Sequence, residues 1–189
     1  MLAPVLRSET QARLLAALLL QPGREASIAE LARETGSDSG NLHAEVERLV
    51  RADVLADRRV GRTRLLRASG SPLVRPLADL LVLGYGPKSA LEQALCGHAG
   101  VEAAYIGGSW AARFNGENGA FPHDIDVIVV GSLDRDAVTD VLVDSLAGIG
   151  HDAQVIFRSA SAWAAARDAF TRTAKAGPLV ELNLATTHG

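Results

Sequence analysis

Two aspartates spaced two residues apart, Asp124 and Asp126, enter the apolar run Val127–Val130. In a β-strand, side chains two residues apart point to the same face, so the two carboxylates would lie side by side while Ile125 faces the core. Adjacent anions on a buried strand repel one another unless a cation lies between them. Carboxylate oxygens suit Mg²⁺, which usually takes one or two carboxylates together with substrate phosphates. The pair therefore predicts a magnesium site.

A glycine-rich turn, Gly107-Gly108-Ser109, precedes the aspartates and ends an apolar, strand-like stretch. Glycine permits close backbone approach, and the N–H groups at a helix start are a usual place for a phosphate. We therefore expect Gly108 and Ser109 to bind nucleotide phosphates. Arg113 follows by about one helical turn and is a candidate for holding a triphosphate, with a pair to Glu117 as the alternative. Turn and aspartates together predict a site for a metal-bound nucleotide.

The two motifs in combination resemble a known signature. Gly108-Ser109, fourteen intervening residues and then Asp124-x-Asp126 in an apolar strand are similar to the signature of the nucleotidyltransferase superfamily known from DNA polymerase beta. The longer pattern resembles the small prokaryotic nucleotidyltransferases that are fused behind a winged-helix domain. The resemblance implies a small mixed-sheet fold in which Asp124 and Asp126 are catalytic and hold Mg²⁺. It also implies that an NTP, with ATP as the expected one, binds at Gly108 and Ser109.

The strand that follows Asp126 departs from the family pattern. Active members commonly carry a third carboxylate there, but the corresponding residue is Gln154, an amide that cannot serve as a base or a strong Mg²⁺ ligand. Asp152 lies one pleat earlier on the same face and is a candidate substitute ligand. Enzymatic activity therefore stays open. The alternatives are transfer to an unknown acceptor, a degenerate domain that senses nucleotide or binds a partner, and a toxin–antitoxin component that modifies a protein or tRNA.

The first seventy residues show the outline of a helix-turn-helix. One predicted helix starts after Ser8 and continues to Leu20, and a second follows the capping-box pattern Ser27-x-x-Glu30 and runs to Thr35. A turn at residues 36–38 separates it from a third helix that begins at Ser39. In the third helix, three apolar residues follow the helical period, which predicts one buried stripe: Leu42, Val46 and Leu49. Helix, short glycine-containing turn and helix are typical of DNA-binding domains.

An arginine-rich hairpin follows the third helix. Residues 54–67 predict two short strands around Gly61, with five arginines and one acid between Ala56 and Arg67. The hairpin resembles the wing of bacterial winged-helix regulators of the ArsR and MarR type. A charged hairpin that is merely solvated is the alternative. The resemblance implies that the third helix enters the major groove of double-stranded DNA and that the wing contacts the DNA beside it. The DNA-binding residues it implies are Ser39, Asn41, His43, Arg58, Arg62 and Arg64.

The chain is predicted to be an α+β protein of two domains. Ser69-Gly70-Ser71-Pro72 marks the boundary after a winged helix over residues 1–70. An apolar connecting helix, Leu73–Leu83, is expected to be broken by Gly84-Tyr85-Gly86-Pro87 within the linker 71–87. Residues 88–189 then form the nucleotidyltransferase-like domain, with a helix over 137–146, a strand over 151–157, a helix over 161–170, and a strand or short helix over 179–182. The apolar helices 13–20 and 73–83 favour a homodimer.

Charge and cysteine content indicate the kind of partner and the cellular compartment to expect. Residues 1–70 carry eleven arginines against nine acids, whereas residues 71–189 carry eight basic residues against thirteen acids. The basic excess in front favours a nucleic-acid partner for the first domain. The single cysteine, Cys96, excludes an internal disulfide, is expected to be buried, and favours a cytoplasmic location. The longest apolar run, Leu14–Leu20, is too short to span a bilayer, so no membrane association is expected.

Overall fold

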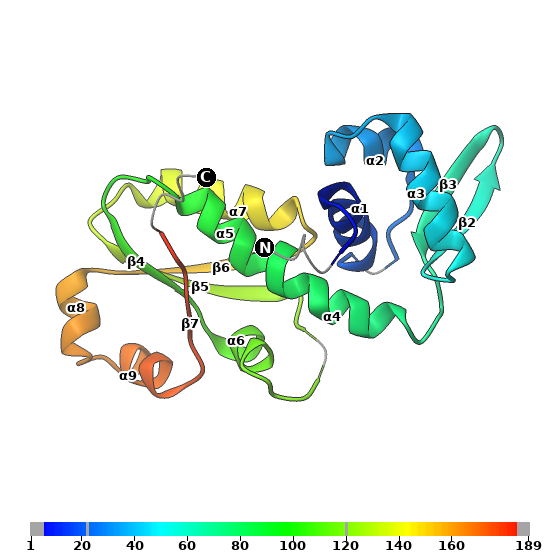
Figure 1. Ribbon diagram of the computed structural model, residues 1–189. Coiled ribbons are helices and arrows are strands. Elements are labelled where there is room, and N and C mark those ends of the chain that lie inside the picture. Colours follow the sequence, from blue (N-terminus) through cyan, green and yellow to red (C-terminus); the bar gives the residue numbers. More distant parts are fainter. Residues whose placement is uncertain (1–5, 22, 120, 185–189) are drawn as a thin grey trace. The chain divides into compact units, whose positions relative to one another are not determined.

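The computed structural model describes residues 6–21, 23–119 and 121–184 (Figure 1). The chain forms two compact units, Met1–Gly86 and Pro87–Gly189, and each unit has its own β-sheet. The protein is therefore α+β, as the sequence predicts. Within the described ranges, none of the helices combines the length and the apolar composition needed to cross a membrane.

The first unit is a winged helix. Its three strands form an antiparallel sheet in the order β1-β3-β2. Helices α2 and α3 form the helix-turn-helix, which precedes the β2–β3 hairpin in the chain (Figure 1). The elements are α1 Glu9–Leu19, β1 Ala26–Ser27, α2 Ile28–Thr35, α3 Ser39–Arg51, β2 Leu55–Val60, β3 Thr63–Ala68 and α4 Val74–Tyr85. Only β1, two residues long, has no counterpart in the sequence-based expectation.

Side-chain caps fix the helix starts of this unit. The Ser8 hydroxyl accepts from the Gln11 N–H at 3.1 Å, and the predicted capping box of Ser27 and Glu30 is present. Asp38 caps α3, since its carboxylate accepts from the Gly40 N–H at 2.8 Å. The apolar stripe of α3 is buried together with the leucines of α1. These contacts hold α3 in place and leave its opposite side exposed.

The expected break within residues 84–87 is present, but α4 continues through Gly84 to Tyr85 before it ends at Gly86. A single glycine costs a helix only about 1 kcal/mol, which packing outweighs. Leu81 and Val82 are buried, and the Tyr85 hydroxyl donates to the Glu9 carboxylate at 2.8 Å. Helix α4 is thereby anchored on α1, inside the first unit.

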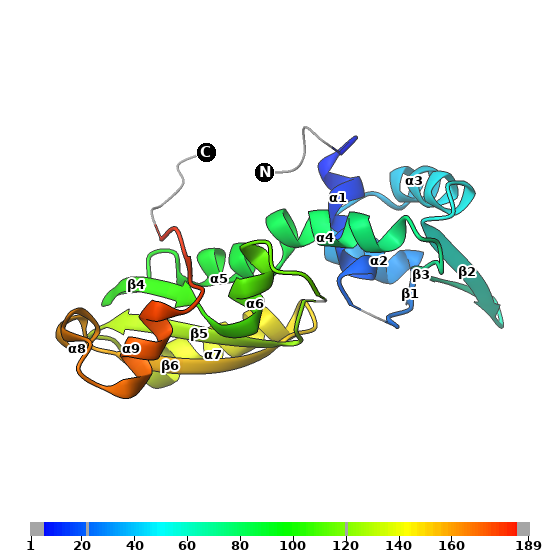
Figure 2. The same cartoon turned by 90° about the horizontal axis from the view of Figure 1, so that it is seen from below.

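The second unit contains a mixed four-stranded sheet in the order β6-β5-β4-β7, in which only the β5–β6 pair is parallel. Helices α5 and α7 lie on one face of this sheet, and α8 and α9 lie on the other (Figures 1 and 2). The elements are α5 Pro87–Leu95, β4 Val101–Ile106, α6 Gly108–Phe114, β5 Asp124–Gly131, α7 Arg135–Ala147, β6 Asp152–Arg158, α8 Ala160–Ala165, α9 Ala169–Ala176 and β7 Val180–Glu181.

Two expectations for the second unit are wrong. The helix predicted over 161–170 is two helices, because Ala166 adopts a left-handed conformation with φ +48° and ends α8. Asp168 then caps α9 by accepting from the Thr171 N–H at 2.9 Å and the Thr171 hydroxyl at 2.6 Å. Cys96 is exposed rather than buried, since it follows the last residue of α5.

Candidate functional site

The two aspartates of β5 have the alternation that the sequence predicts. Ile125 and Val127 are fully buried, whereas Asp124 is exposed and Asp126 is partly buried. Within the described ranges, neither aspartate side chain forms a hydrogen bond or an ion pair. Two carboxylates without a partner on one strand face are a site of negative charge that suits a cation.

Gly108 lies directly against the Asp126 carboxylate. Its backbone has φ +64°, and a Cβ atom added to it would lie 2.2 Å from Asp126 Oδ2. The preceding Gly107 donates its N–H to the Asp126 carbonyl oxygen at 2.9 Å. Only glycine satisfies both the left-handed backbone and the close approach. The structure therefore brings together the glycine turn and the central aspartate.

The register between β5 and β6 decides which residue faces each aspartate. The parallel pairing sets Asp152 beside Asp124 and Gln154 beside Asp126. An amide thus occupies the position next to the central carboxylate. The Asp152 carboxylate is 3.3 Å from His123 Nε2, and the His151 ring packs on that of His123 with centroids 5.7 Å apart. Burial lowers the pKa of the His151 imidazole, which favours its neutral form.

The other two residues predicted to bind phosphate are in α6. Ser109 is its second residue and is exposed. The Arg113 guanidinium pairs with the Glu117 carboxylate at 3.0 Å, which is the alternative that the sequence left open. Arg113 also packs over Gly119, where an added Cβ atom would lie 2.7 Å from its Nε. A phosphate contact by Arg113 stays a prediction and would compete with Glu117.

The donor set fits a cation that is shared with a ligand. Among the residues that the structure describes, no three His, Cys, Asp or Glu side chains are grouped to hold a metal ion by themselves. Mg²⁺ seldom needs such a cage, because it keeps waters and takes one or two carboxylates plus phosphate oxygens. Asp124 and Asp126 supply that pair. Asp152, beside Asp124 in register, stays a predicted third ligand.

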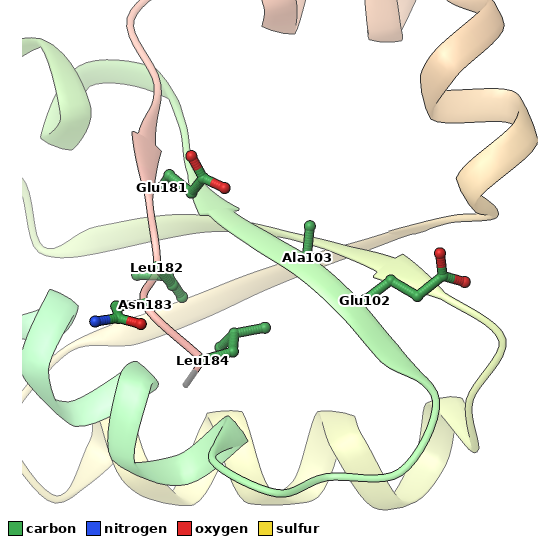
Figure 3. Close-up of a pocket in the computed structure, with 6 residues that line it drawn as sticks. All are labelled: Glu102, Ala103, Glu181, Leu182, Asn183 and Leu184. Atoms are coloured by element: carbon green, nitrogen blue, oxygen red, sulfur yellow. The ribbon is translucent and has the colours of Figure 1, made fainter. Parts of the chain in front are cut away.

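The described residues of the second unit line at least two cavities. One of about 370 Å³ adjoins Gly108 and Asp126 on the α9 side of the sheet. The other, of about 420 Å³, lies at the β4–β7 edge, where Glu102 and Glu181 flank Ala103 (Figure 3). The second cavity contains none of the residues that the sequence singled out, whereas the first adjoins the predicted site. Its lining was not foreseen, because α9 was not separated from α8.

In the first unit, the predicted DNA-reading residues lie on α3. Asn41 and His43 are exposed, and they flank the buried Leu42 on the helix. Ser39 begins α3, and its side chain lies outside the described part of the structure. The two exposed side chains are polar, as contacts from a helix in a major groove require.

The arginines of the wing differ in their surroundings. Arg58 forms a two-pronged pair with Glu25, with Nε at 2.8 and 3.0 Å from the two carboxylate oxygens. Arg64 joins the wing to α3, since it donates to Asp57 at 2.7 Å and also pairs with Glu47.

Two further wing arginines, Arg59 and Arg62, are exposed, and no acid within the described part of the chain pairs with them. Sequence reasoning selected Arg62 but missed Arg59. The strand alternation, which sends Arg58 and Arg59 to opposite faces, was the available signal.

No protein-family model and no curated protein matches the chain. Among solved structures, the chain is similar to reduced HlyU from Vibrio cholerae N16961, with 24% identity and a TM-score of 0.37 over 44% of this chain and 84% of that chain. It is also similar to the adhesin competence repressor AdcR from Streptococcus pyogenes, with 20% identity and a TM-score of 0.34 over 40% of this chain and 55% of that chain. The winged-helix assignment rests on the order and pairing of the elements in the first unit.

Proposed function

We propose that the protein is a DNA-binding regulator whose first unit holds duplex DNA. In this proposal α3 enters the major groove through Ser39, Asn41 and His43, and the wing lies along the phosphate backbone. The observation that carries it is the pair of exposed arginines, Arg59 and Arg62, which have no acid partner among the described residues. Their charge is available for phosphates, whereas that of Arg58 and Arg64 is already offset within the unit.

The salt dependence of DNA binding tests this proposal. The logarithm of the binding constant for a mixed-sequence duplex should fall linearly with the logarithm of salt concentration, with a slope of roughly 0.9 per phosphate contact. Arg59→Ala combined with Arg62→Ala should reduce that slope by about 1.8, the sum of two contacts. The control is Arg13→Ala with Arg75→Ala, which removes the same charge from α1 and α4. Equal slopes for wild type and the wing variant would overturn the assignment.

We propose for the second unit that it binds a nucleoside triphosphate together with Mg²⁺. The specific support is the close approach of Gly108 to the Asp126 carboxylate, which has no partner among the described residues. Asp124 and Asp126 would hold the ion, whose charge offsets that of the phosphates. Gly108 and Ser109 would bind the phosphates by their N–H and hydroxyl groups. ATP and Mg²⁺ added together should then raise the unfolding midpoint by more than either alone.

Nucleotidyl transfer would extend this binding function. Transfer requires that an acceptor hydroxyl attack the α-phosphorus while pyrophosphate leaves, and a neighbouring carboxylate ordinarily helps to remove the proton. The residue beside Asp126 is Gln154, which cannot accept that proton. Incubation with α-labelled ATP and either protein or tRNA separates the alternatives. Label retained on an acceptor indicates a transferase, including one of a toxin–antitoxin pair, and binding without label indicates a nucleotide sensor.

Gln154→Asp supplies the carboxylate that the site lacks and sharpens that experiment. If the amide is what limits transfer, the variant should label an acceptor faster than wild type under the same conditions. If neither protein labels any acceptor while both bind ATP, the second unit acts as a sensor. The DNA experiment then decides what the sensor controls.

A further inference from the structure

Charge is divided unevenly along the second unit. Residues 87–157 carry three basic residues against ten acids, whereas residues 158–178 carry four basic residues against one acid. The short segment 158–178 contains the end of β6 together with helices α8 and α9. A unit that is acidic over most of its length therefore concentrates its positive charge in one place.

The two faces of the sheet differ in the sign of their charge. Helix α7 lies on one face and carries three exposed aspartates that share one side of the helix, because they are four residues apart: Asp136, Asp140 and Asp144. Helices α8 and α9, with the basic segment, lie on the other face (Figures 1 and 2). A polyanion is therefore repelled by the α7 face and attracted to the α8–α9 face. The cavity beside Asp126 is on this same α9 side.

Three cations of the segment, Arg167, Arg172 and Lys175, are exposed and have no acid partner among the residues that the structure describes. Arg172 donates to the Arg167 carbonyl oxygen, which holds its guanidinium beside the loop between α8 and α9. Lys175 Nζ lies 5.0 Å from the ring centroid of Trp163 on α8, and it is a neighbour of Arg172 on α9 because the two are three residues apart. We call these three residues the basic surface.

The fourth cation of the segment supports the basic surface from below. Arg158, the last residue of β6, pairs with Asp168 at 3.5 Å and donates to the Thr171 hydroxyl at 3.3 Å. Asp168 in turn caps α9. These contacts fix the start of α9 to the sheet, and the charge of Arg158 is offset within the unit. The three residues of the basic surface thus lie on a fixed support and keep their charge available.

The chemistry of the basic surface favours phosphate over a lipid bilayer. Two of its three cations are arginines, whose planar guanidinium matches the oxygens of a phosphate. A helix that lies on a membrane combines its cations with a large free apolar face. The apolar side of α9 is already used, because Ala174 packs against the buried Ile128 and Trp163 of the sheet and α8.

We propose that the basic surface binds the phosphodiester backbone of a single-stranded nucleic acid, RNA or DNA. This site is separate from the wing and from the residues proposed to hold Mg²⁺ and ATP. The inference deepens the transfer function proposed above and rests on it in one respect, the class of acceptor. A strand held on the α8–α9 face lies on the face of the sheet where Asp126 is found, and its end carries a free hydroxyl. The acceptor is then a nucleic-acid strand rather than a protein.

The experiment titrates labelled oligouridylate and oligothymidylate of equal length into the full chain at several salt concentrations, followed by fluorescence anisotropy. The chain carries Arg59→Ala and Arg62→Ala, and nucleotide and Mg²⁺ are left out, so that neither the wing nor the metal site contributes. Replacing Arg167, Arg172 and Lys175 by Gln should reduce the slope of log affinity against log salt by about 2.1, three contacts of roughly 0.7 each. The tighter of the two oligonucleotides identifies the strand.

Two further variants separate loss of charge from loss of fold. Arg167→Lys with Arg172→Lys keeps the charge and should keep the slope. The matched control Arg13→Gln, Arg75→Gln and Arg135→Gln removes the same charge from α1, α4 and α7 and should leave the slope unchanged.

An unchanged slope in the Gln variant of the basic surface, or an equal loss in the control, would overturn the proposal. Binding to vesicles of anionic phospholipid without binding to either oligonucleotide would also overturn it. Because no nucleotide is present, such a failure leaves the proposed binding of ATP and Mg²⁺ standing. Conversely, strand binding by a chain that fails to bind ATP would support the basic surface and overturn only the nucleotide function.

Discussion

The wing of the first unit contains both paired and unpaired arginines, whereas the two aspartates of β5 in the second unit are both unpaired among the described residues. In the wing, Arg58 and Arg64 are paired with acids of other elements, and these pairs fix the hairpin to Glu25 and to α3. On β5, Asp124 and Asp126 have no partner within the described ranges. Charges that form pairs within the protein contribute to folding. Unpaired charges lower the free energy of unfolding, and we expect them to be retained for a ligand.

The comparison predicts different results for the two kinds of residue. Substitutions at open groups should change binding and leave stability nearly constant or raised. Substitutions within closed networks should lower the free energy of unfolding and leave the intrinsic ligand contacts in place. The following experiments test that division.

The largest effect is expected at Gly108. Gly108→Ala should abolish nucleotide binding, because the new Cβ atom would displace the Asp126 carboxylate 2.2 Å away. Gly97→Ala is the matched control, since Gly97 has a similar φ of +74° but no atom within 4 Å. Both variants should lose about 1–2 kcal/mol of unfolding free energy for the left-handed conformation. Calorimetry should find binding lost only in Gly108→Ala, and equal binding by both would refute the role of the turn.

The exposed leucines at the two ends of α4 should take part in dimer formation. Leu73 and Leu83 are 58% and 48% exposed, and we expect this helix to form a homodimer seam. Leu83→Ser should weaken the dimer by about 1.5–3 kcal/mol for each side chain that becomes exposed. Val143→Ser, at the similarly exposed Val143 of α7, is the control. A monomer mass for wild type by light scattering at tens of micromolar would remove the prediction.

The hydrogen bonds at the start of α9 should affect stability rather than association or binding. Thr171→Val removes the hydroxyl that bonds to Asp168 and Arg158, and the loss should destabilise the unit by about 1–3 kcal/mol. Thr139→Val is the control, because the Thr139 hydroxyl bonds only to the Arg135 carbonyl of its own helix. Denaturant unfolding measures both. Equal stabilities would show that the network does not hold α9.

The smallest expected effects concern the pH dependence of stability, which differs between the two units. Hydrogen bonds from Thr171 lower the pKa of Asp168 to about 2, so its contribution is present above its ordinary pKa of 3.8 and is lost as the pH falls towards 2. Burial raises the pKa of Tyr85 to about 12, so its contribution is complete below pH 10 and is lost as the pH rises towards 12.

Substitution should remove each arm of this pH profile separately. Tyr85→Phe should cost about 0.5–1.5 kcal/mol at neutral pH and flatten the alkaline arm alone. Asp168→Asn should flatten the acid arm alone. Denaturant unfolding of each variant across the pH range, followed by circular dichroism, would measure this, and a profile that both substitutions leave unaltered would contradict the assignment.

Local patterns made much of the fold predictable. The caps at Ser8 and Ser27, the alternation of β5 and the wing hairpin depend on neighbours close in sequence. The resemblance set Gln154 at the position of the missing third carboxylate, and the parallel register pairs it with Asp126.

Contacts between distant residues were not predictable. The pair of Arg58 with Glu25 joins residues 33 apart, and no local pattern indicates it. The end of α8 at Ala166 also has no local signal, since alanine favours helix. The helix ends there because the chain turns before Asp168, which caps α9. The cavity beside Asp126 depends on that break, because residues of α9 line it.

The most direct test of the central claim is a titration of ATP into the full chain with Mg²⁺ and, separately, with a chelator in place of the metal. We predict binding only with Mg²⁺ in wild type. Asp124→Asn with Asp126→Asn should abolish the metal dependence while the metal-free fold becomes no less stable, because like charges are removed from one strand face. ATP binding of equal affinity with and without Mg²⁺, or no binding in either condition, would contradict the assignment of β5 as a metal–nucleotide site.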